Sequence, residues 1–267
     1  MISRCTEADA QEILDFIGDD YSRCLYLYLD MVQYGFNTPF VSMWRQNFAD
    51  SSLAAVWLRY HSGMHVYAPR GYADADEAAA FVRSEHPAML CGVPDVLKPL
   101  ETKMAEDGYA FHGGTVCQYD HKPEGLERIE LRLAESDADF NRIGDMLYSD
   151  PDYGTSYSPG ELASQLRERY RLGQGRSYVG EFDGTIVVHG CVAAECDQFA
   201  LLNGGITDPR WRHKGVCTKL LFTMSDDLSK AGKRVYSMYY NPIAAALHRK
   251  AGYVDCCEWG RLFIKTH

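Results

Sequence analysis

The fold is decided by residues 207–221, which read TDPRWRHKGVCTKLL. An apolar strand is predicted just before them, over residues 199–207, and a helix just after them. The helix is amphipathic, because its apolar side chains recur at helical spacing (Leu220, Leu221, Met224 and Leu228). A loop at a helix N-terminus offers free backbone N–H groups and the positive end of the helix dipole. The stretch therefore predicts a binding site for a phosphate or pyrophosphate group.

The side chains of this loop favour the same ligand. Gly215 lacks the Cβ that would keep an anion away from the backbone. Five side chains add positive charge nearby: Arg210, Arg212, His213, Lys214 and Lys219. The loop is not a Walker P-loop, because no Gly-Lys-Ser/Thr follows at the spacing that such a loop needs.

These residues resemble the acyl-coenzyme A binding motif of the GCN5-related N-acetyltransferase (GNAT) superfamily, roughly Val-x-Pro-x-Tyr/Trp-Arg/Gln-x-x-Gly-x-Gly/Ala-x-x-Leu-Leu. Pro209, Trp211, Arg212 and Gly215 match the motif, whereas Thr207 replaces its Val and Cys217 its second small residue. The resemblance implies acetyl-CoA as the acyl donor. It also implies the residues that hold this coenzyme: Ile206, Thr207, Arg212, His213, Lys214, Gly215, Val216, Cys217, Thr218 and Asn241.

The pattern of strands and helices extends the resemblance over residues 126–267. Their predicted order is β-α-α-β-β-β-α-β-α-β-β, which is similar to the superfamily arrangement. The fold class is thus α/β (α+β), with a mixed, mostly antiparallel, splayed sheet flanked by helices. Gly204 and Gly205 predict a bulge in the strand before the loop. In the superfamily the strands splay there, and pantetheine lies between them like an added strand.

Residues 1–125 are predicted to form a second, smaller α/β lobe. Its strand, helix and Gly108-Tyr109 echo the strand, helix and Gly252-Tyr253 of the other half. Two interpretations stay open, a degenerate second GNAT-like lobe and an unrelated α/β lobe. Since it has nothing like Arg212-x-x-Gly215, this lobe is not expected to bind coenzyme in the same way.

Composition and charge exclude several classes of protein. A net charge of −10 and an isoelectric point near 5.4 disfavour a broad nucleic-acid surface. No apolar run is long enough to span a membrane, and the N-terminus, MISRCTEADA, is unlike a signal peptide. The cysteines number nine and include no Cys-x-x-Cys pair, which favours reduced thiols over zinc or disulfides. We expect a cytoplasmic protein without a metal, a membrane or a nucleic-acid partner.

Candidate catalytic residues come from the second half of the chain. The family commonly has a tyrosine as proton donor where this chain has His248, seven residues after Asn241. His248 either donates this proton or only fills the position while water does so. Glu195 is the candidate base, acting through water. Three tyrosines, Tyr148, Tyr153 and Tyr157, are candidates to line an acceptor cleft, and His189 is expected to be a packed core residue.

The resulting prediction is an N-acyltransferase that moves acetyl from acetyl-CoA to the primary amine of a small molecule or peptide by direct attack. Two alternatives remain. One is a coenzyme-binding sensor or scaffold without catalysis, which the replacements at Cys217 and His248 favour. The other is a tandem-lobe aminoacyl transferase that uses charged tRNA, against which the intact loop argues.

Overall fold

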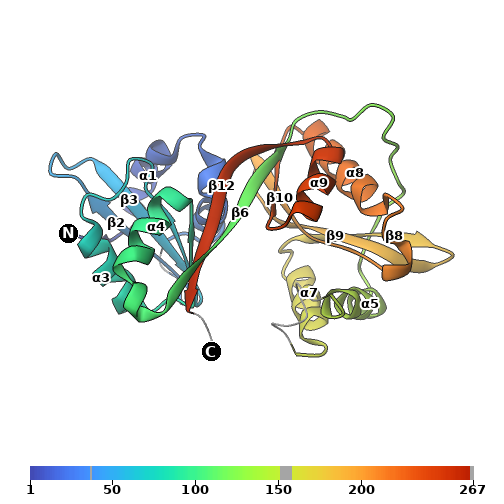
Figure 1. Cartoon of the computed structure of the whole chain (residues 1–267), viewed down its shortest axis with the longest axis horizontal. Helices are drawn as coiled ribbons and strands as arrows, with labels where there is room; N and C mark the ends of the chain where they lie inside the picture. Colours follow the sequence, from blue (N-terminus) through green and yellow to red (C-terminus); the bar gives the residue numbers. More distant parts are fainter. Residues whose placement is uncertain (37, 151–157, 265–267) are drawn as a thin grey trace. The chain divides into compact units, whose positions relative to one another are not determined.

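The computed structural model describes residues 1–36, 38–150 and 158–264, which form two compact units (Figure 1). Unit 1 comprises Met1–Val116 and the chain from Cys256 on, and unit 2 comprises Cys117–Asp255. The sequence places one boundary between residues 125 and 126. In the structure the chain changes unit twice, after Val116 and after Asp255.

Unit 1 follows a simple order of strands and helices. A short strand and two helices come first: β1 (Ser3–Arg4), α1 (Ala10–Ile17) and α2 (Leu25–Tyr34), with 3₁₀ turns η1 (Glu7–Asp9) and η2 (Tyr21–Arg23). Three strands follow: β2 (Val41–Asn47), β3 (Leu53–Tyr60) and β4 (Gly63–Tyr67). The rest alternates: α3 (Ala75–Glu85), β5 (Met89–Gly92), α4 (Pro94–Lys103), η3 (Ala105–Asp107) and β6 (Tyr109–Tyr119).

Unit 2 repeats that order. It begins with β7 (Arg132–Leu133), α5 (Asp137–Tyr148) and α7 (Glu161–Arg171). Three strands follow: β8 (Arg176–Phe182), β9 (Thr185–Glu195) and β10 (Phe199–Thr207). The chain continues through η4 (Pro209–Trp211), α8 (Val216–Lys230), β11 (Arg234–Tyr239), α9 (Pro242–Lys250) and β12 (Tyr253–Ile264).

The strand pairing is also the same in the two units. In unit 1, β1 to β4 pair antiparallel in sequence, and β4 pairs parallel with β5. In unit 2, β7 to β10 pair antiparallel in sequence, and β10 pairs parallel with β11. Each unit is thus a mixed, mostly antiparallel sheet with a parallel pair. This repetition favours the second-lobe interpretation of the N-terminal half over an unrelated lobe.

The last strands of the two halves are exchanged. β12 follows α9 of unit 2, yet its later residues pair antiparallel with β5 of unit 1, with Gly260 opposite Gly92. The end of β6, from Cys117 to Tyr119, belongs to unit 2, where β6 is next to β11 in the strand order. There the Cys117 thiol donates to the Ser237 carbonyl at 3.5 Å.

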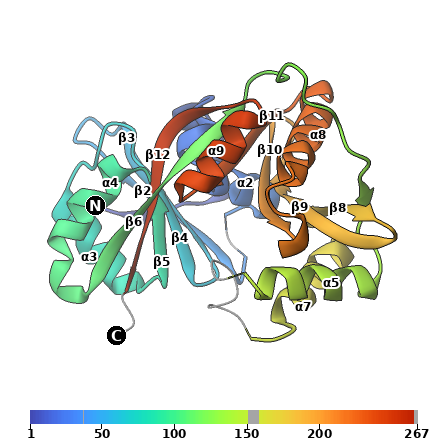
Figure 2. The ribbon, with the colours of Figure 1, turned by 45° about the vertical axis from the view of Figure 1, so that its right-hand side comes forward.

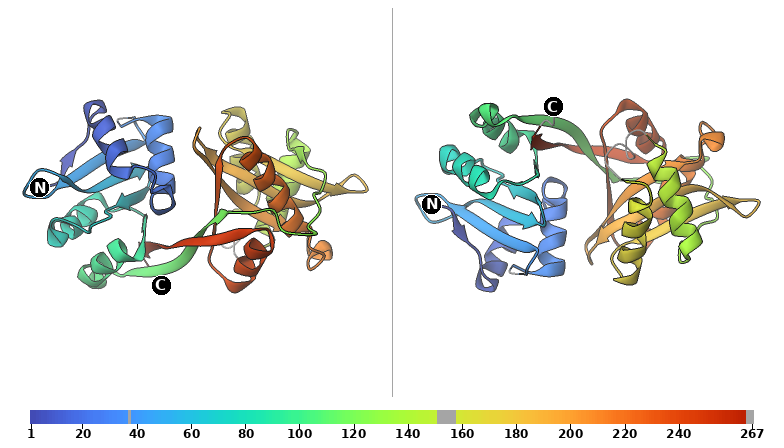
Figure 3. Two further views of the ribbon diagram at one scale, coloured as in Figure 1. Left: turned by 90° about the horizontal axis from the view of Figure 1, so that it is seen from above. Right: turned by 90° about the horizontal axis from the view of Figure 1, so that it is seen from below.

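Helices cover both faces of each sheet. In unit 2, α8 and α9 lie on one face and α5 and α7 on the other (Figure 3). Close packing of α8 needs Gly190 on β9, because a Cβ there would stand 2.7 Å from Leu220. In unit 1, α3 and α4 cover one face (Figure 2), where Phe81 of α3 packs on the fully buried Trp57 of β3. Over the described ranges, no helix is both long and apolar enough to cross a membrane.

Candidate functional site

The sheet of unit 2 opens between β10 and β11. These strands pair at only three positions, the last being Leu201 with Tyr236, although β10 continues to Thr207. On its other edge, β10 shifts register against β9 between Asn203 and Ile206, and Gly204 has φ of +66°. The bulge predicted at Gly204 and Gly205 is confirmed. Beyond Leu201, β10 therefore has an edge without a paired neighbour on β11, which suits an extended ligand.

The loop after β10 ends at an N-terminus of α8 that is free of acidic groups. Gly215 is the N-cap of α8, with φ of +75°, and no side chain caps the helix. A Cβ at Gly215 would meet nothing within 4 Å, so the space around it is open. No acidic residue occurs in the first turn. The backbone N–H groups and helix dipole are therefore available to an anion.

The corresponding helix of unit 1 is closed to an anion. The Asp74 carboxylate caps α3, accepting from the N–H of Asp76 at 2.9 Å and of Glu77 at 3.0 Å. Asp76 and Glu77 add further negative charge to the first turn. The two equivalent helices thus differ in their charge, and the N-terminus of α8 is the one suited to phosphate.

The basic residues of the loop serve different roles. Arg212 donates from Nε to the Thr207 carbonyl at 3.2 Å and from Nη2 to Asp150 at 3.0 Å. Lys214 lies with its Nζ 4.4 Å from the centre of the Trp211 ring. Lys214 is thus held within the loop, whereas Arg212 also connects the loop to Asp150 beyond the end of α5. His213 is exposed and adopts φ of +63°, the left-handed conformation that turns the chain toward Gly215.

Asp208 is a buried carboxylate that holds this loop in place. It was not identified from the sequence. It is 4% exposed and accepts from the N–H of Arg210 at 3.0 Å and from its Nε at 3.1 Å. Arg142 of α5 forms an ion pair with the same carboxylate. The Arg210 side chain, followed by Arg142, holds the pKa of Asp208 well below its usual range. Its only local signal was an Asp directly before Pro209, typical of a turn.

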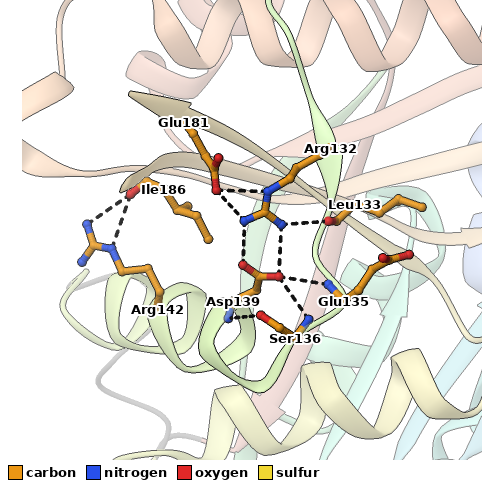
Figure 4. A network of polar contacts seen from close by, with 8 residues as sticks. All are labelled: Arg132, Leu133, Glu135, Ser136, Asp139, Arg142, Glu181 and Ile186. Carbon is orange, nitrogen blue, oxygen red and sulfur yellow. Dashed lines mark hydrogen bonds and ion pairs between the residues drawn. The ribbon is translucent and has the colours of Figure 1, made fainter. Parts of the chain in front are cut away.

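Arg142 belongs to α5, whose N-terminus is held by a network of polar contacts (Figure 4). Asp139 forms a paired contact with Arg132 of β7, at 2.7 and 3.1 Å, and accepts from the N–H of Ser136 at 3.1 Å. Ser136 in turn caps α5 by accepting from the N–H of Asp139 at 3.1 Å. One turn further on, Arg142 donates to the Ile186 carbonyl at 3.3 Å. Arg142 therefore connects α5 to Asp208 and the loop.

Most of the residues predicted to bind coenzyme surround this loop. Ile206 and Thr207 are buried at the end of β10, and Val216, Cys217 and Thr218 form the first turn of α8. The Cys217 sulfur lies 3.7 Å from where a Cβ of Gly205 would be. Burial raises the pKa of the Cys217 thiol. The structure therefore brings the strand end, the loop and the helix turn together.

The remaining predicted ligand, Asn241, lies at the end of β11. It is the N-cap of α9, and its side-chain oxygen accepts from the N–H of Ala244 at 2.8 Å. A capping role accounts for this contact.

His248 is buried on α9, and both of its ring nitrogens have partners. Nδ1 lies 2.7 Å from the Ala244 carbonyl and Nε2 2.9 Å from the Ser237 hydroxyl. The rings of Tyr239 and Tyr253 pack against it, with centroids at 5.6 and 5.3 Å. Burial lowers the pKa of His248. These contacts favour a neutral ring that holds structure, the second of the two roles left open by the sequence.

Glu195 lies at the far end of the β9–β10 hairpin from the loop. It pairs with Ala200 at the start of β10, whereas Thr207 at the other end pairs with Val188. These positions are seven residue steps apart along β10, roughly 23 Å at 3.3 Å per residue. Its carboxylate forms ion pairs with Arg176 at 2.8 Å and Lys233 at 2.9 Å. The structure therefore does not bring Glu195 to the loop.

Two further expectations concern the surroundings of the bulge. His189 is 1% exposed, bonds the Gly204 carbonyl through Nδ1 at 2.9 Å, and has its pKa lowered to about 4 by burial. It is the packed core histidine that the sequence predicts. Tyr148 is 41% exposed at the end of α5, while Tyr153 and Tyr157 lie outside the described residues. Within the described part of the chain, no three His, Cys, Asp or Glu side chains gather as a metal site would require.

Much of the second half of the chain matches a known family. Residues 145–253 match the family model "Acetyltransferase (GNAT) family". This part of the chain is a GNAT domain. The matched range contains the loop, the bulge and α9, so the resemblance seen in residues 207–221 is confirmed. No curated protein matches the chain.

Solved structures with a similar fold cover nearly the whole chain. A GNAT-family acetyltransferase from Colwellia psychrerythraea is 14% identical, with coverage of 99% of this chain and 100% of that one and a TM-score of 0.60. A GCN5-related N-acetyltransferase from Sphaerobacter thermophilus is 14% identical, with coverage of 98% and 94% and a TM-score of 0.62. A tandem GNAT protein from the clavulanic acid biosynthesis pathway is 14% identical, with coverage of 98% and 97% and a TM-score of 0.57.

Proposed function

We propose that this protein is an N-acyltransferase that transfers the acetyl group of acetyl-CoA to a primary amine of a small molecule or peptide. The observation that carries the proposal is the uncapped N-terminus of α8 at Gly215, directly after the splayed end of β10. One element there suits a pyrophosphate and the other an extended amide chain. Both lie within the GNAT domain.

The coenzyme would be held by complementary charge and by backbone groups. Its pyrophosphate would accept from the N–H groups of residues 213–218, with Arg212 and Lys214 supplying positive charge. Its pantetheine arm would follow the edge of β10 that has no partner on β11. The predicted ligands from Ile206 to Thr218 would then contact the coenzyme together.

The chemistry follows from that placement. A neutral amine nitrogen attacks the thioester carbonyl carbon, and backbone N–H groups around Ile206 and Thr207 stabilise the oxyanion. The C–N bond forms, the C–S bond breaks, and the amine proton passes to water. The departing thiolate takes its proton from water, because His248 has both nitrogens engaged. Water rather than Glu195 takes the amine proton, because Glu195 lies at the end of the hairpin opposite the loop.

A coenzyme-binding protein without transferase activity is the second candidate. The commitment of His248 to Ala244 and Ser237 is the observation that favours it. It differs from the first candidate in one respect, since acetyl-CoA would bind but no amine would be acetylated.

A transfer assay separates the candidates. The protein is incubated with acetyl-CoA and a panel of polyamines, amino acids, aminoglycosides and peptides. Released coenzyme thiol and the mass of each amine are then measured. Arg212→Ala should reduce thiol release, while Arg70→Ala is the matched control. Arg70 occupies the equivalent loop of unit 1 and likewise donates to a strand carbonyl, Leu53, at 3.0 Å. Transfer that is equally insensitive to both substitutions would contradict the proposal.

A further inference from the structure

The Ser237 hydroxyl lies at the point where β10 and β11 part. Ser237 is the first residue of β11 after the last β10–β11 pair, and the residue is 4% exposed. Its Oγ stands 3.2 Å from the Leu202 carbonyl of β10 and 2.9 Å from His248 Nε2 of α9. One hydroxyl therefore lies between an acceptor on the splayed strand and a histidine.

The directions of the hydrogen bonds between Ala244, His248 and Ser237 follow from the hydrogens that each group carries. The Ala244 carbonyl only accepts, so the hydrogen between it and His248 belongs to Nδ1. In a neutral imidazole Nε2 is then an acceptor, and the single hydrogen of Ser237 is the donor that reaches it. A hydroxyl hydrogen that points to Nε2 is not available to the Leu202 carbonyl.

The Leu202 carbonyl is placed for an incoming ligand. Leu202 follows the last residue of β10 that pairs with β11, so its carbonyl lies at the beginning of the open edge. An amide N–H of an extended chain laid along this edge would need such an acceptor, as an added strand does. Whether the acceptor is free depends on where the Ser237 hydroxyl points.

We propose that His248 is a positioning residue for coenzyme binding: by accepting from Ser237, it keeps that hydroxyl off the Leu202 carbonyl and leaves this carbonyl for an amide N–H of the pantetheine arm. The inference rests on the proposed function, because it assigns a role within the same coenzyme site. It differs from a proton-donor role, in which His248 would act on the departing thiolate.

The arrangement depends on the charge of His248. A protonated ring donates from Nε2 to Ser237, whose hydrogen then turns to the Leu202 carbonyl and occupies it. The groups facing the ring are Tyr239 of β11, Tyr253 and Asp255 of β12, and the Ala244 carbonyl of α9. Asp255 is held by Tyr239 at 2.7 Å and Arg249 at 3.0 Å, and burial of the ring opposes its protonation. Acetyl-CoA affinity should thus fall on the acid side.

Substitutions of His248 and Ser237 should have opposite effects on the affinity for acetyl-CoA. His248→Leu removes the acceptor, so the hydroxyl turns to Leu202 and the Kd for acetyl-CoA should rise about tenfold, the worth of one neutral hydrogen bond. His248→Gln keeps an acceptor for Ser237 and should bind nearly as the native protein does. The double variant His248→Leu/Ser237→Ala has no hydroxyl to block the carbonyl and should regain affinity.

Calorimetric titration of acetyl-CoA at several pH values tests these expectations, with thermal unfolding as the check on folding. If His248→Leu does not fold, Ser237→Ala decides, because it should abolish the loss of affinity at acid pH. Unchanged affinity in His248→Leu, or no recovery in the double variant, would overturn the inference. A fall in kcat with unaltered Kd would assign His248 to proton donation instead.

A measurement without coenzyme tests this inference independently of the proposed function. In protein labelled with ¹⁵N at histidine, the His248 shifts at neutral pH should report a hydrogen on Nδ1 and none on Nε2. A hydrogen on Nε2 would overturn the inference even if acetyl-CoA binds. Conversely, the expected tautomer without any acetyl-CoA binding would refute the proposed function, and with it the role of Leu202.

Discussion

The Asp208 carboxylate accepts hydrogen bonds from both the backbone N–H and the side chain of Arg210, at 3.0 and 3.1 Å. The contact closes the turn that leads from β10 into the loop before α8. Arg142 of α5 forms an ion pair with the same carboxylate. The loop that carries Gly215 is therefore fixed by a buried carboxylate, and the geometry of the anion site depends on it.

Replacing Asp208 should lower stability substantially. Asp208→Asn removes a charge whose side chain is 6% exposed and leaves Arg142 incompletely paired. We expect a loss of about 3 kcal/mol in the free energy of unfolding, measured by urea denaturation. Asp137→Asn is the control, because Asp137 is paired with Arg167 but 73% exposed, and it should cost less than about 1 kcal/mol. Equal losses in the two variants would contradict this account.

The same carboxylate should contribute to acid sensitivity. Its pKa is lowered in the folded protein, chiefly by the Arg210 side chain. A lowered pKa gives stability that is complete above the unfolded value of about 3.9 and is lost as the pH falls toward the folded value. The native protein should therefore lose more stability than Asp208→Asn below about pH 4. Unfolding curves at a series of acid pH values measure this, and parallel curves would speak against it.

Glu195→Gln should leave acetyl transfer unchanged. Glu195 is engaged by Arg176 and Lys233 at the end of the hairpin opposite the loop. Loss of these partly exposed pairs should cost at most about 1 kcal/mol of stability. Steady-state rates on the acceptor found in the amine panel measure the first effect and urea denaturation the second. A hundredfold loss of kcat would return Glu195 to the list of candidate bases.

Gly252 should tolerate no side chain. It has φ of +94°, and a Cβ there would lie 2.0 Å from the His121 carbonyl oxygen. Gly252→Ala should therefore cost at least about 3 kcal/mol, because the backbone around His121 must move. Gly232→Ala is matched to it, with φ of +84° and nothing within 4 Å, and should cost about 1 kcal/mol. Thermal unfolding compares the two, and similar melting temperatures would rule out the backbone clash.

The features predicted correctly from the sequence are those with a local signal. Gly215, the apolar periodicity of α8 and the two glycines of β10 are read within a window of about 25 residues, because caps and bulges depend on neighbouring residues. The resemblance to the family motif rests on residues 207–221, within the same window. His189 was also placed in the core correctly, as a polar residue within an apolar strand.

Features built from distant residues were missed. Asp208 and Arg142 are 66 positions apart, and no sequence pattern around either residue indicates that they form an ion pair. Glu195 was proposed as a base because it lies near the end of a strand. The antiparallel register, which the sequence does not specify, places it opposite Ala200 and away from Thr207. The pairing of β12 with β5 joins the end of the chain to unit 1, and local pattern does not specify such long-range partners.

The most direct test of the account is calorimetric titration of acetyl-CoA into the native protein, Gly215→Asp and Gly71→Asp. Both glycines have positive φ, +75° and +81°, and neither has a neighbour within 4 Å of a Cβ, so the backbone strain is matched. We predict that the native protein and Gly71→Asp bind alike. Gly215→Asp, which puts a carboxylate at the N-terminus of α8, should lose binding by at least a hundredfold. Absence of binding to the native protein, or equal binding by both variants, would contradict a coenzyme site at this loop.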